Sequence, residues 1–325
     1  MADSIKQPAE LASDLSMGTT HLPGRDVLER AVLRAFTVRS DLKGLLHWGG
    51  HCLALLGTGL LVGATRGTLV LLVPAMILHG FLIVTLFAPM HECVHMTAFR
   101  SRWLNRVIGW LAGAATFTNS DWYRSFHSWH HRYTQDPARD PELRTPKPRT
   151  LTEYWQRIIG LNFWRDRGRE LLLITCGRTA YIPFVPEYAR QRLIRSVRAQ
   201  VALYGLIALG AIGWQSTAPL VYWVLPVLLG QPLLRCILLA EHTGCSEDAN
   251  GLTNTRTTLT TWPVRFCMWN MPYHAEHHLY PAIPFHALPQ VHRQLRERLA
   301  HLDNGYVRVN QAIVHSLGQT ARTAG

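Results

Sequence analysis

Four apolar stretches limit what this chain can fold into. They cover residues 45–64, 68–90, 199–214 and 218–240, and each approaches the ~20 apolar residues that a helix needs to cross the hydrocarbon core of a bilayer. Only three residues separate the first two stretches, and three separate the last two. A buried core helix would explain any one stretch, but two closely spaced pairs predict two helical hairpins that cross a membrane and return. We therefore expect an all-α integral membrane protein with four transmembrane helices.

The distribution of positive charge predicts the orientation of these helices. The 325 residues carry a net charge of +12, and of 33 Lys and Arg only Arg66 lies in a hairpin tip and only Arg235 lies inside a span. Positive charge marks the cytoplasmic side of a membrane protein. We expect both termini and the long middle connection to be cytoplasmic. This orientation explains the net positive charge, so no nucleic-acid partner is needed to account for it.

The rest of the chain is predicted to surround the spans. We expect a cytosolic N-terminal arm over residues 1–44, a membrane domain over 45–295 and a cytosolic C-terminal tail over 296–325. The first thirty residues lack the apolar core of a signal peptide, so no cleavable leader is expected. Residues 103–117 and 151–184 are amphipathic and predict a helical cap at the membrane surface. The Pro-rich segment 135–150 predicts an exposed loop.

Histidine is the unusual residue of this sequence, with 17 copies. Three clusters, HECVH, HSWHH and HAEHH, repeat the spacings i, i+3 and i+4, which place imidazoles on one face of a helix, and a single histidine follows the fourth span. Nine imidazoles are too many for one metal ion and suit two, and imidazole binds Zn, Cu, Fe and Ni alike. The candidate ligands are His91, His95, His127, His130, His131, His242, His274, His277 and His278.

At these clusters the sequence resembles the membrane fatty acid desaturase and hydroxylase superfamily. The matching segments are HECVH, FHSWHH and NMPYHAEHHLYPAIPFHALP, in that order and with the spans between them. The resemblance implies a non-haem di-iron centre held by the nine histidines on the cytosolic side, with O2 as co-substrate and a lipid or acyl substrate. It also implies an external electron donor, and the basic cytosolic face suits an acidic ferredoxin or cytochrome-b-type protein.

Several other residues are candidates for the surroundings of the metal ions. Carboxylates that could orient imidazole N–H groups are Glu92, Asp121, Asp140, Glu241 and Glu276. Plain solvated acids would explain each of them equally well. Asn270 lies one helical turn before His274 and could hold a water or a ligand. Aromatic residues that could line an apolar tunnel, or equally form an interfacial belt, are Trp122, Tyr123, Trp129, Trp262, Phe266 and Trp269.

Other functions fit parts of this pattern. HECVH is also a formal HExxH motif, in which His91 and His95 would bind zinc and Glu92 would act as the general base of a membrane metalloprotease. That interpretation leaves both HxxHH clusters without a role. A metal transporter would place its ligands near the bilayer midplane, whereas these lie beyond the predicted spans. Within the di-iron interpretation, we favour desaturation of an acyl chain over hydroxylation or ketolation of a lipid, carotenoid or small metabolite.

Overall fold

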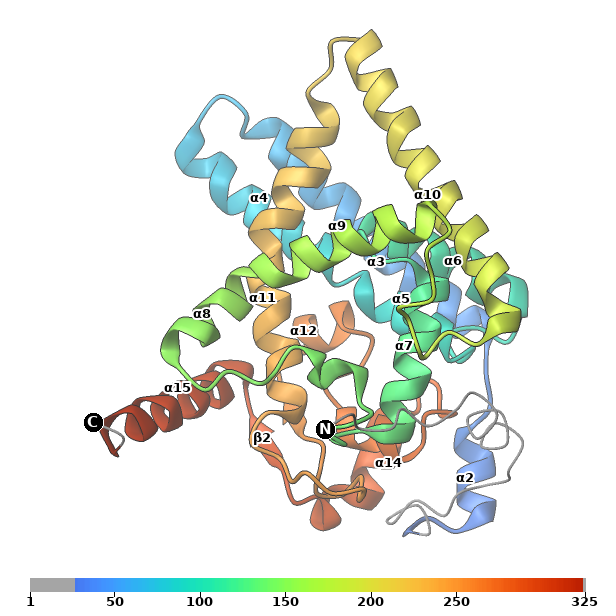
Figure 1. Ribbon diagram of the computed structural model, residues 1–325, viewed down its shortest axis with the longest axis vertical. Helices are drawn as coiled ribbons and strands as arrows, with labels where there is room; N and C mark the ends of the chain where they lie inside the picture. The colour runs from blue at the N-terminus through green and yellow to red at the C-terminus, as the bar shows by residue number, and fades with distance from the viewer. Residues whose placement is uncertain (1–26, 324–325) are drawn as a thin grey trace, which may run out of the picture.

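The computed structural model describes residues 27–323, so most of the predicted N-terminal arm lies outside the described residues. The described chain is mostly helical (Figure 1). Its helices before the middle of the chain are α2 (Arg30–Phe36), α3 (Asp41–Ala64), α4 (Leu69–Val84), α5 (Phe87–Val94), α6 (Arg102–Ala115), α7 (Ser120–Tyr133), α8 (Leu151–Ile159) and α9 (Leu161–Thr175). They are followed by α10 (Glu187–Gly213), α11 (Leu225–His242), α12 (Trp262–Cys267), α13 (His274–Leu279), α14 (Leu288–Leu295) and α15 (Tyr306–Thr323). Two short strands, β1 (Thr257–Leu259) and β2 (Leu302–Asn304), pair in parallel.

Four helical segments are long and apolar enough to cross a membrane, as the sequence predicted. They are Asp41–Ala64, Leu69–Val94, Glu187–Gly213 and Leu220–His242. The second joins α4 and α5, and the fourth joins a π-helical turn, Leu220–Val224, to α11. The third helix begins well before the predicted residue 199, because its charged first half continues the same helix. Apolarity marked only part of that helix and not its start.

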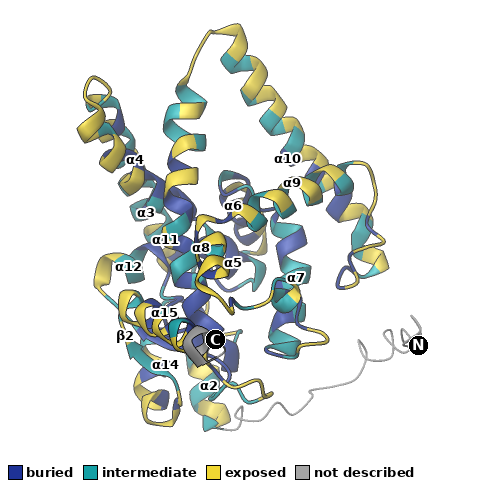
Figure 2. Ribbon diagram, turned by 60° about the vertical axis from the view of Figure 1, so that its left-hand side comes forward, coloured by how far each residue is buried: buried dark blue, intermediate teal, exposed yellow. Residues whose placement is uncertain are grey.

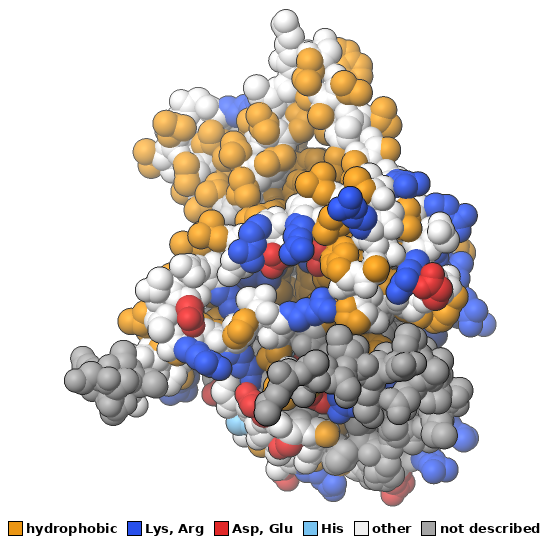
Figure 3. Space-filling view, viewed as in Figure 1, with side chains coloured by type: hydrophobic (Ala, Val, Ile, Leu, Met, Phe, Trp, Pro, Cys, Tyr) orange, Lys and Arg blue, Asp and Glu red, His pale blue; other side chains and the backbone are white. Residues whose placement is uncertain are grey.

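The outer surfaces of these helices are apolar. In the most apolar window of α3 and of α10, only 11% of the residues are buried, and Leu53, Leu60 and Leu209 are each more than 60% exposed. Figure 2 shows exposed residues along the upper part of the helices, and Figure 3 shows hydrophobic side chains there, with Lys and Arg lower down. A water-soluble protein rarely leaves so large an apolar surface uncovered, so this composition suits contact with lipid.

The two predicted hairpins differ in how closely their helices pack against each other. Helix α3 packs on α4, and α4 packs closely on α11. Helix α10 contacts α9 and α7, and Figure 1 shows it diverging from α11 below the turn that joins them. The amphipathic segments form α6, α8 and α9 as predicted, and they lie across the ends of the long helices. Residues of the predicted C-terminal tail form β2 and α15, which contacts α11 and α8.

A pair of glycines permits the close contact between α4 and α11. A Cβ atom on Gly80 would lie 1.9 Å from the Pro226 carbonyl oxygen, and one on Gly230 would lie 2.3 Å from the Gly80 carbonyl carbon. Small residues let membrane helices approach in this way. Helix α4 leads through Thr85 and Leu86 into α5, which carries His91, and α11 ends at His242, so the two histidines follow their glycines by 11 and 12 residues. The glycine contact therefore holds together the two segments that lead to these histidines.

We predict that Gly80→Ala destabilises the protein, because overpacking of a tight contact costs about 1–3 kcal/mol or more. The measurement is the midpoint of thermal unfolding in detergent. Gly57→Ala is the matched control, since a Cβ atom there meets nothing within 4 Å. An unfolding midpoint for Gly80→Ala equal to that of the control would show that the helices do not pack as described.

Candidate metal centre

Eight of the nine predicted ligands form two clusters of imidazoles. In each cluster the candidate ligand atoms lie within 4.8 Å of one another. The first cluster draws on α5, α7 and α13, and it contains His91, His95, His127, His131 and His277. The second draws on α7, α11 and α13, and it contains His130, His242 and His278. The structure thus brings together histidines that are up to 187 positions apart in the sequence.

Helix geometry explains how one HxxHH motif serves both clusters. Residues i+3 and i+4 lie on the same general face of a helix but about 100° apart. On α7, the rings of His127 and His131 lie 4.4 Å apart in the first cluster, whereas His130 turns toward His242, with ring centres 5.0 Å apart. On α13, His277 joins the first cluster and His278 joins the second. The two motifs therefore link two neighbouring sites.

The ninth predicted ligand, His274, lies beside the second cluster. Its ring centre is 4.5 Å from that of His278 and 5.1 Å from that of His242. Its Nε2 lies 3.5 Å from the Glu241 carboxylate, and its Nδ1 is buried without a hydrogen-bond partner. The His274 ring therefore borders the second cluster without belonging to its tight group.

Nitrogen atoms without partners indicate what these clusters can hold. Buried nitrogens with no hydrogen-bond partner among the described residues include His91 Nε2, His95 Nε2, His130 Nε2, His242 Nε2 and His278 Nε2. Buried polar atoms normally have partners, so this many orphans in one place need an explanation. Burial, followed by neighbouring histidines, lowers the pKa of His131 and His278 well below the usual value. Neutral imidazoles with free lone pairs are suitable metal ligands.

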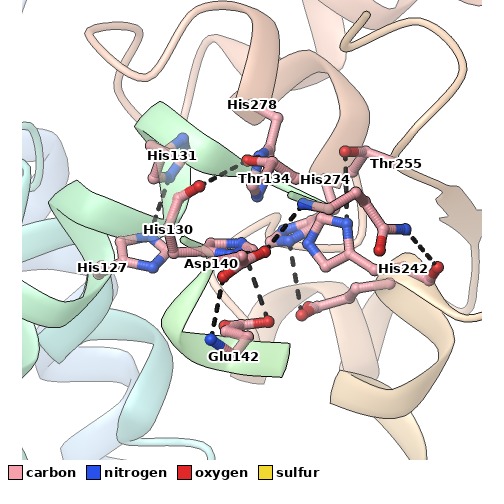
Figure 4. Close-up of polar contacts among 12 residues, drawn as sticks. His127, His130, His131, Thr134, Asp140, Glu142, His242, Thr255, His274 and His278 are labelled. Atoms are coloured by element: carbon pink, nitrogen blue, oxygen red, sulfur yellow. Dashed lines mark hydrogen bonds and ion pairs between the residues drawn. The ribbon is translucent and has the colours of Figure 1, made fainter. Parts of the chain in front are cut away.

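Asp140 fixes the orientation of one imidazole. Its carboxylate oxygens accept from His130 Nδ1 at 2.9 and 3.1 Å (Figure 4), which leaves His130 Nε2 free to face the cluster. The backbone N–H groups of Gln135 and Glu142 donate to the same carboxylate at 2.9 Å. The prediction of an exposed loop over 135–150 is wrong here, because Asp140 is only 4% exposed. Carboxylates commonly orient metal-ligating histidines in this way.

The other predicted carboxylates have different partners. Glu92 accepts from Thr97 Oγ1 at 2.8 Å and from the Phe285 N–H at 3.2 Å, so it connects the first histidine motif to the segment after the third. Glu276 is fully buried and binds His292 and Thr257. These two carboxylates hold the backbone that carries the histidines. Their described hydrogen bonds do not reach a candidate ligand.

Asp121 and Asn270 contact residues other than the candidate ligands. Asp121 pairs with Arg192 at 2.8 Å, at the start of α7. The Asn270 amide donates to the Phe285 carbonyl at 3.1 Å. Their roles near the metal ions stay predictions, because sequence spacing gave the distance of each residue from a histidine along the chain but not the direction of its side chain.

Sequence reasoning missed several contacts of the clusters. Glu142 Oε2 lies 3.8 Å from His130 Nε2, and its position two residues after Asp140 was the available signal. Tyr123 Oη lies 3.2 Å from His127 Nδ1, and Thr134 Oγ1 lies 3.2 Å from His278 Nδ1. Tyr123 was predicted only as a tunnel residue, and nothing in the sequence singled out Thr134.

A cavity of about 400 Å³ opens on the histidines. It lies between α7, α9 and α11 and reaches His127, His274 and Glu241. Of the aromatic residues predicted to line a tunnel, Trp122 and Tyr123 line this cavity. Trp262 is instead 66% exposed, and Trp269 is buried against His47. The cavity has the size of a small-molecule site.

We predict that Asp140→Asn weakens metal binding about 10–100-fold, the usual effect of removing a carboxylate that orients a ligating histidine. The measurement is titration of purified, metal-free protein with Fe²⁺. Asp121→Asn is the matched control, since the Asp121 carboxylate contacts Arg192. Equal Fe²⁺ affinity in the two variants would contradict the role of Asp140.

Comparison with known proteins identifies the family. The family model "Fatty acid desaturase" matches residues 67–310. The chain is 26% identical to the dihydrorhizobitoxine desaturase of Bradyrhizobium elkanii, over 67% of this chain and 64% of that protein. It is 28% identical to the sphingolipid delta(4)-desaturase DES1 of Drosophila melanogaster, over 70% of this chain and 67% of that protein. The match to the sn-1 oleoyl-lipid 12-desaturase of a Picosynechococcus strain is 30% identical over 29% of each chain. The chain therefore belongs to the fatty acid desaturase family, as its histidine motifs predicted.

Proposed function

We propose that this protein is a membrane desaturase that uses O2 and electrons from an external donor to remove two hydrogens from an unactivated C–C bond of an acyl substrate. The observation that carries the proposal is the pair of buried histidine clusters beside a cavity large enough for a substrate. The names of the relatives support the reaction type, since three of them are desaturases.

The nine histidines would hold two iron ions. His91, His95, His127, His131 and His277 suit one ion, and His130, His242 and His278, with His274 beside them, suit the other. When bound, the irons supply the O2-dependent oxidation of a C–H bond, which side chains alone cannot perform. The high histidine content fits iron better than a catalytic zinc, which uses three protein ligands and a water.

The protein's own residues would position the reactants and exclude water. Asp140 holds the Nδ1 proton of His130, so that Nε2 keeps its lone pair toward the cluster. Burial lowers the pKa of His131 and His278 well below the usual value, which keeps these two imidazoles available as donors at neutral pH. The cavity places a substrate next to His127 and His274, and its enclosure limits the water that could compete for a reactive centre.

The structure disfavours the metalloprotease alternative. In an HExxH protease the glutamate would face a metal-bound water. Here the Glu92 carboxylate accepts from Thr97 and from the Phe285 N–H. His91 and His95 lie in a cluster with three further histidines, which a single zinc site would not need.

We further propose that the long helices form two hairpins across the membrane, with both termini and the metal centre in the cytoplasm. The positions of Lys and Arg support this orientation, since Arg66 lies at one far turn and the cap carries most of the others (Figure 3). The basic cap would also attract an acidic electron donor, such as a ferredoxin or a cytochrome-b-type protein, by electrostatic steering.

We predict that His277→Ala abolishes product formation and lowers bound iron, because it removes a ligand from the first cluster. The readouts are iron content of purified protein and mass spectrometry of lipids and metabolites from an expressing host. Desaturation appears as a loss of two mass units. His315→Ala, an exposed histidine on α15, is the control. Full activity of His277→Ala would contradict its role as a metal ligand. A product of the unmodified protein that is sixteen mass units heavier than the substrate would indicate hydroxylation and would contradict the proposed desaturation.

The orientation has its own test. An impermeant thiol reagent applied to intact cells should label Arg66→Cys at the turn between α3 and α4. It should leave Cys176 on the cap unlabelled, although that thiol is exposed in the folded protein. Lysed cells provide the positive control for Cys176, and Cys176→Ser provides the background. Labelling of Cys176 in intact cells would reverse the proposed orientation.

A further inference from the structure

Two arginines share one aromatic ring in the wall of the cavity. The guanidinium carbon of Arg235, on α11, lies 4.0 Å from the centre of the Phe163 ring, and that of Arg167, on α9, lies 5.3 Å from it. Arg167 also lies 4.4 Å from the centre of the Trp122 ring. Such cation–π contacts hold a guanidinium in place without neutralising it. All four side chains line the cavity that opens on the histidines.

Both arginines keep unused hydrogen-bond donors. Arg167 pairs with Glu170 at 2.8 Å, yet its Nε is buried and has no partner among the described residues. Within the described chain no carboxylate lies within 4.0 Å of the Arg235 nitrogens. With its amide turned to offer the oxygen, Gln231 accepts from Arg235 at 2.7 and 2.8 Å. A guanidinium carries five N–H donors, so one amide and one carboxylate leave several free.

The lining of the cavity carries more arginines than acidic residues. Of its four acidic residues only Glu170 pairs with one of these arginines, Arg167. Glu142 and Glu241 face histidines at 3.8 and 3.5 Å, and Asp166 pairs with Arg165. The arginines in its wall are Arg144, Arg157, Arg167, Arg169 and Arg235. A surplus of positive charge in a partly enclosed site favours an anion. Figure 3 shows Lys and Arg side chains around the hollow on this face.

We propose that Arg235 and Arg167 bind an anionic group of the substrate, a carboxylate or a phosphate, while the histidine end of the cavity receives the bond to be oxidised. This inference rests on the function proposed above. Arg235 precedes His242 by two helical turns, or about 10 Å along α11. One small molecule therefore spans both ends of the cavity, and its anionic group sets which bond reaches the histidines.

The cavity volume guides the choice of probe. An apolar cavity of ~150 Å³ accommodates benzene, or roughly 25 Å³ per non-hydrogen atom. On that scale a cavity of about 400 Å³ takes roughly 16 such atoms. Decanoate and decyl phosphate both fit this size, and methyl decanoate is the matched ester without a charge.

The test is calorimetric titration of the iron-loaded, full-length protein in lipid nanodiscs under nitrogen, where no turnover occurs. We expect decanoate or decyl phosphate to bind at least tenfold more tightly than methyl decanoate. Arg235→Gln should weaken the preferred anion at least tenfold, or ~1.4 kcal/mol, and leave methyl decanoate unchanged. The stronger of the two charged probes identifies the anion. Equal binding of charged and uncharged probes to the unmodified protein would overturn the proposal.

Three further variants complete the test. Arg235→Lys keeps the charge and should lose less affinity than Arg235→Gln. Arg66→Gln, at the opposite end of the long helices, should bind every probe as the unmodified protein does. Arg167→Gln tests the same site if Arg235→Gln does not fold. Anion binding without product formation would refute only the proposed reaction, whereas desaturation without anion selectivity would refute only this inference.

Discussion

The packing of nine imidazoles into one largely buried region is the constraint on which the rest of the structure depends. Several of their nitrogens, among them Nε2 of His91, His242 and His278, leave water without a hydrogen-bond partner among the described residues, which costs free energy. A bound cation would recover it, as the proposed function requires. Helices α5, α7, α11 and α13 converge on that point. The close contact at Gly80 and Gly230 holds α11 against α4, which leads into α5.

The sequence predicted the parts of this centre that depend on local spacing. Intervals of three and four residues on a helix identified eight of the nine candidate ligands, and the place after the fourth span identified His242. Apolar length was enough to find the four long helices. Side-chain direction was harder to predict. Asp140 lies in a Pro-rich segment that resembles an exposed loop, yet it is buried because His130 needs an acceptor. Asp121, one residue into α7, turns to Arg192.

Contacts between distant segments carried no sequence signal. Glu276 binds His292 and Thr257, and no spacing rule relates these three residues. His292 lies outside the three histidine motifs, yet it is buried against that carboxylate. The arginine pair was also beyond prediction, because Arg167 and Arg235 meet only when α9 crosses α11. The sequence showed that Arg235 lies alone in an apolar stretch, but no spacing indicated that the Phe163 ring would pack against it.

The strand pair β1–β2 connects the third histidine motif to the predicted C-terminal tail, which the sequence analysis had treated as a separate segment. Thr257 of β1 binds Glu276 of the third histidine motif, and the Thr257 N–H donates to the His301 carbonyl at 3.0 Å. Strand β2, which continues from there, pairs with β1, and β1 contacts α13. A chain shortened at residue 295 would keep every candidate ligand and lose this support. The last thirty residues act as part of the scaffold, so a tag or fusion partner belongs after α15.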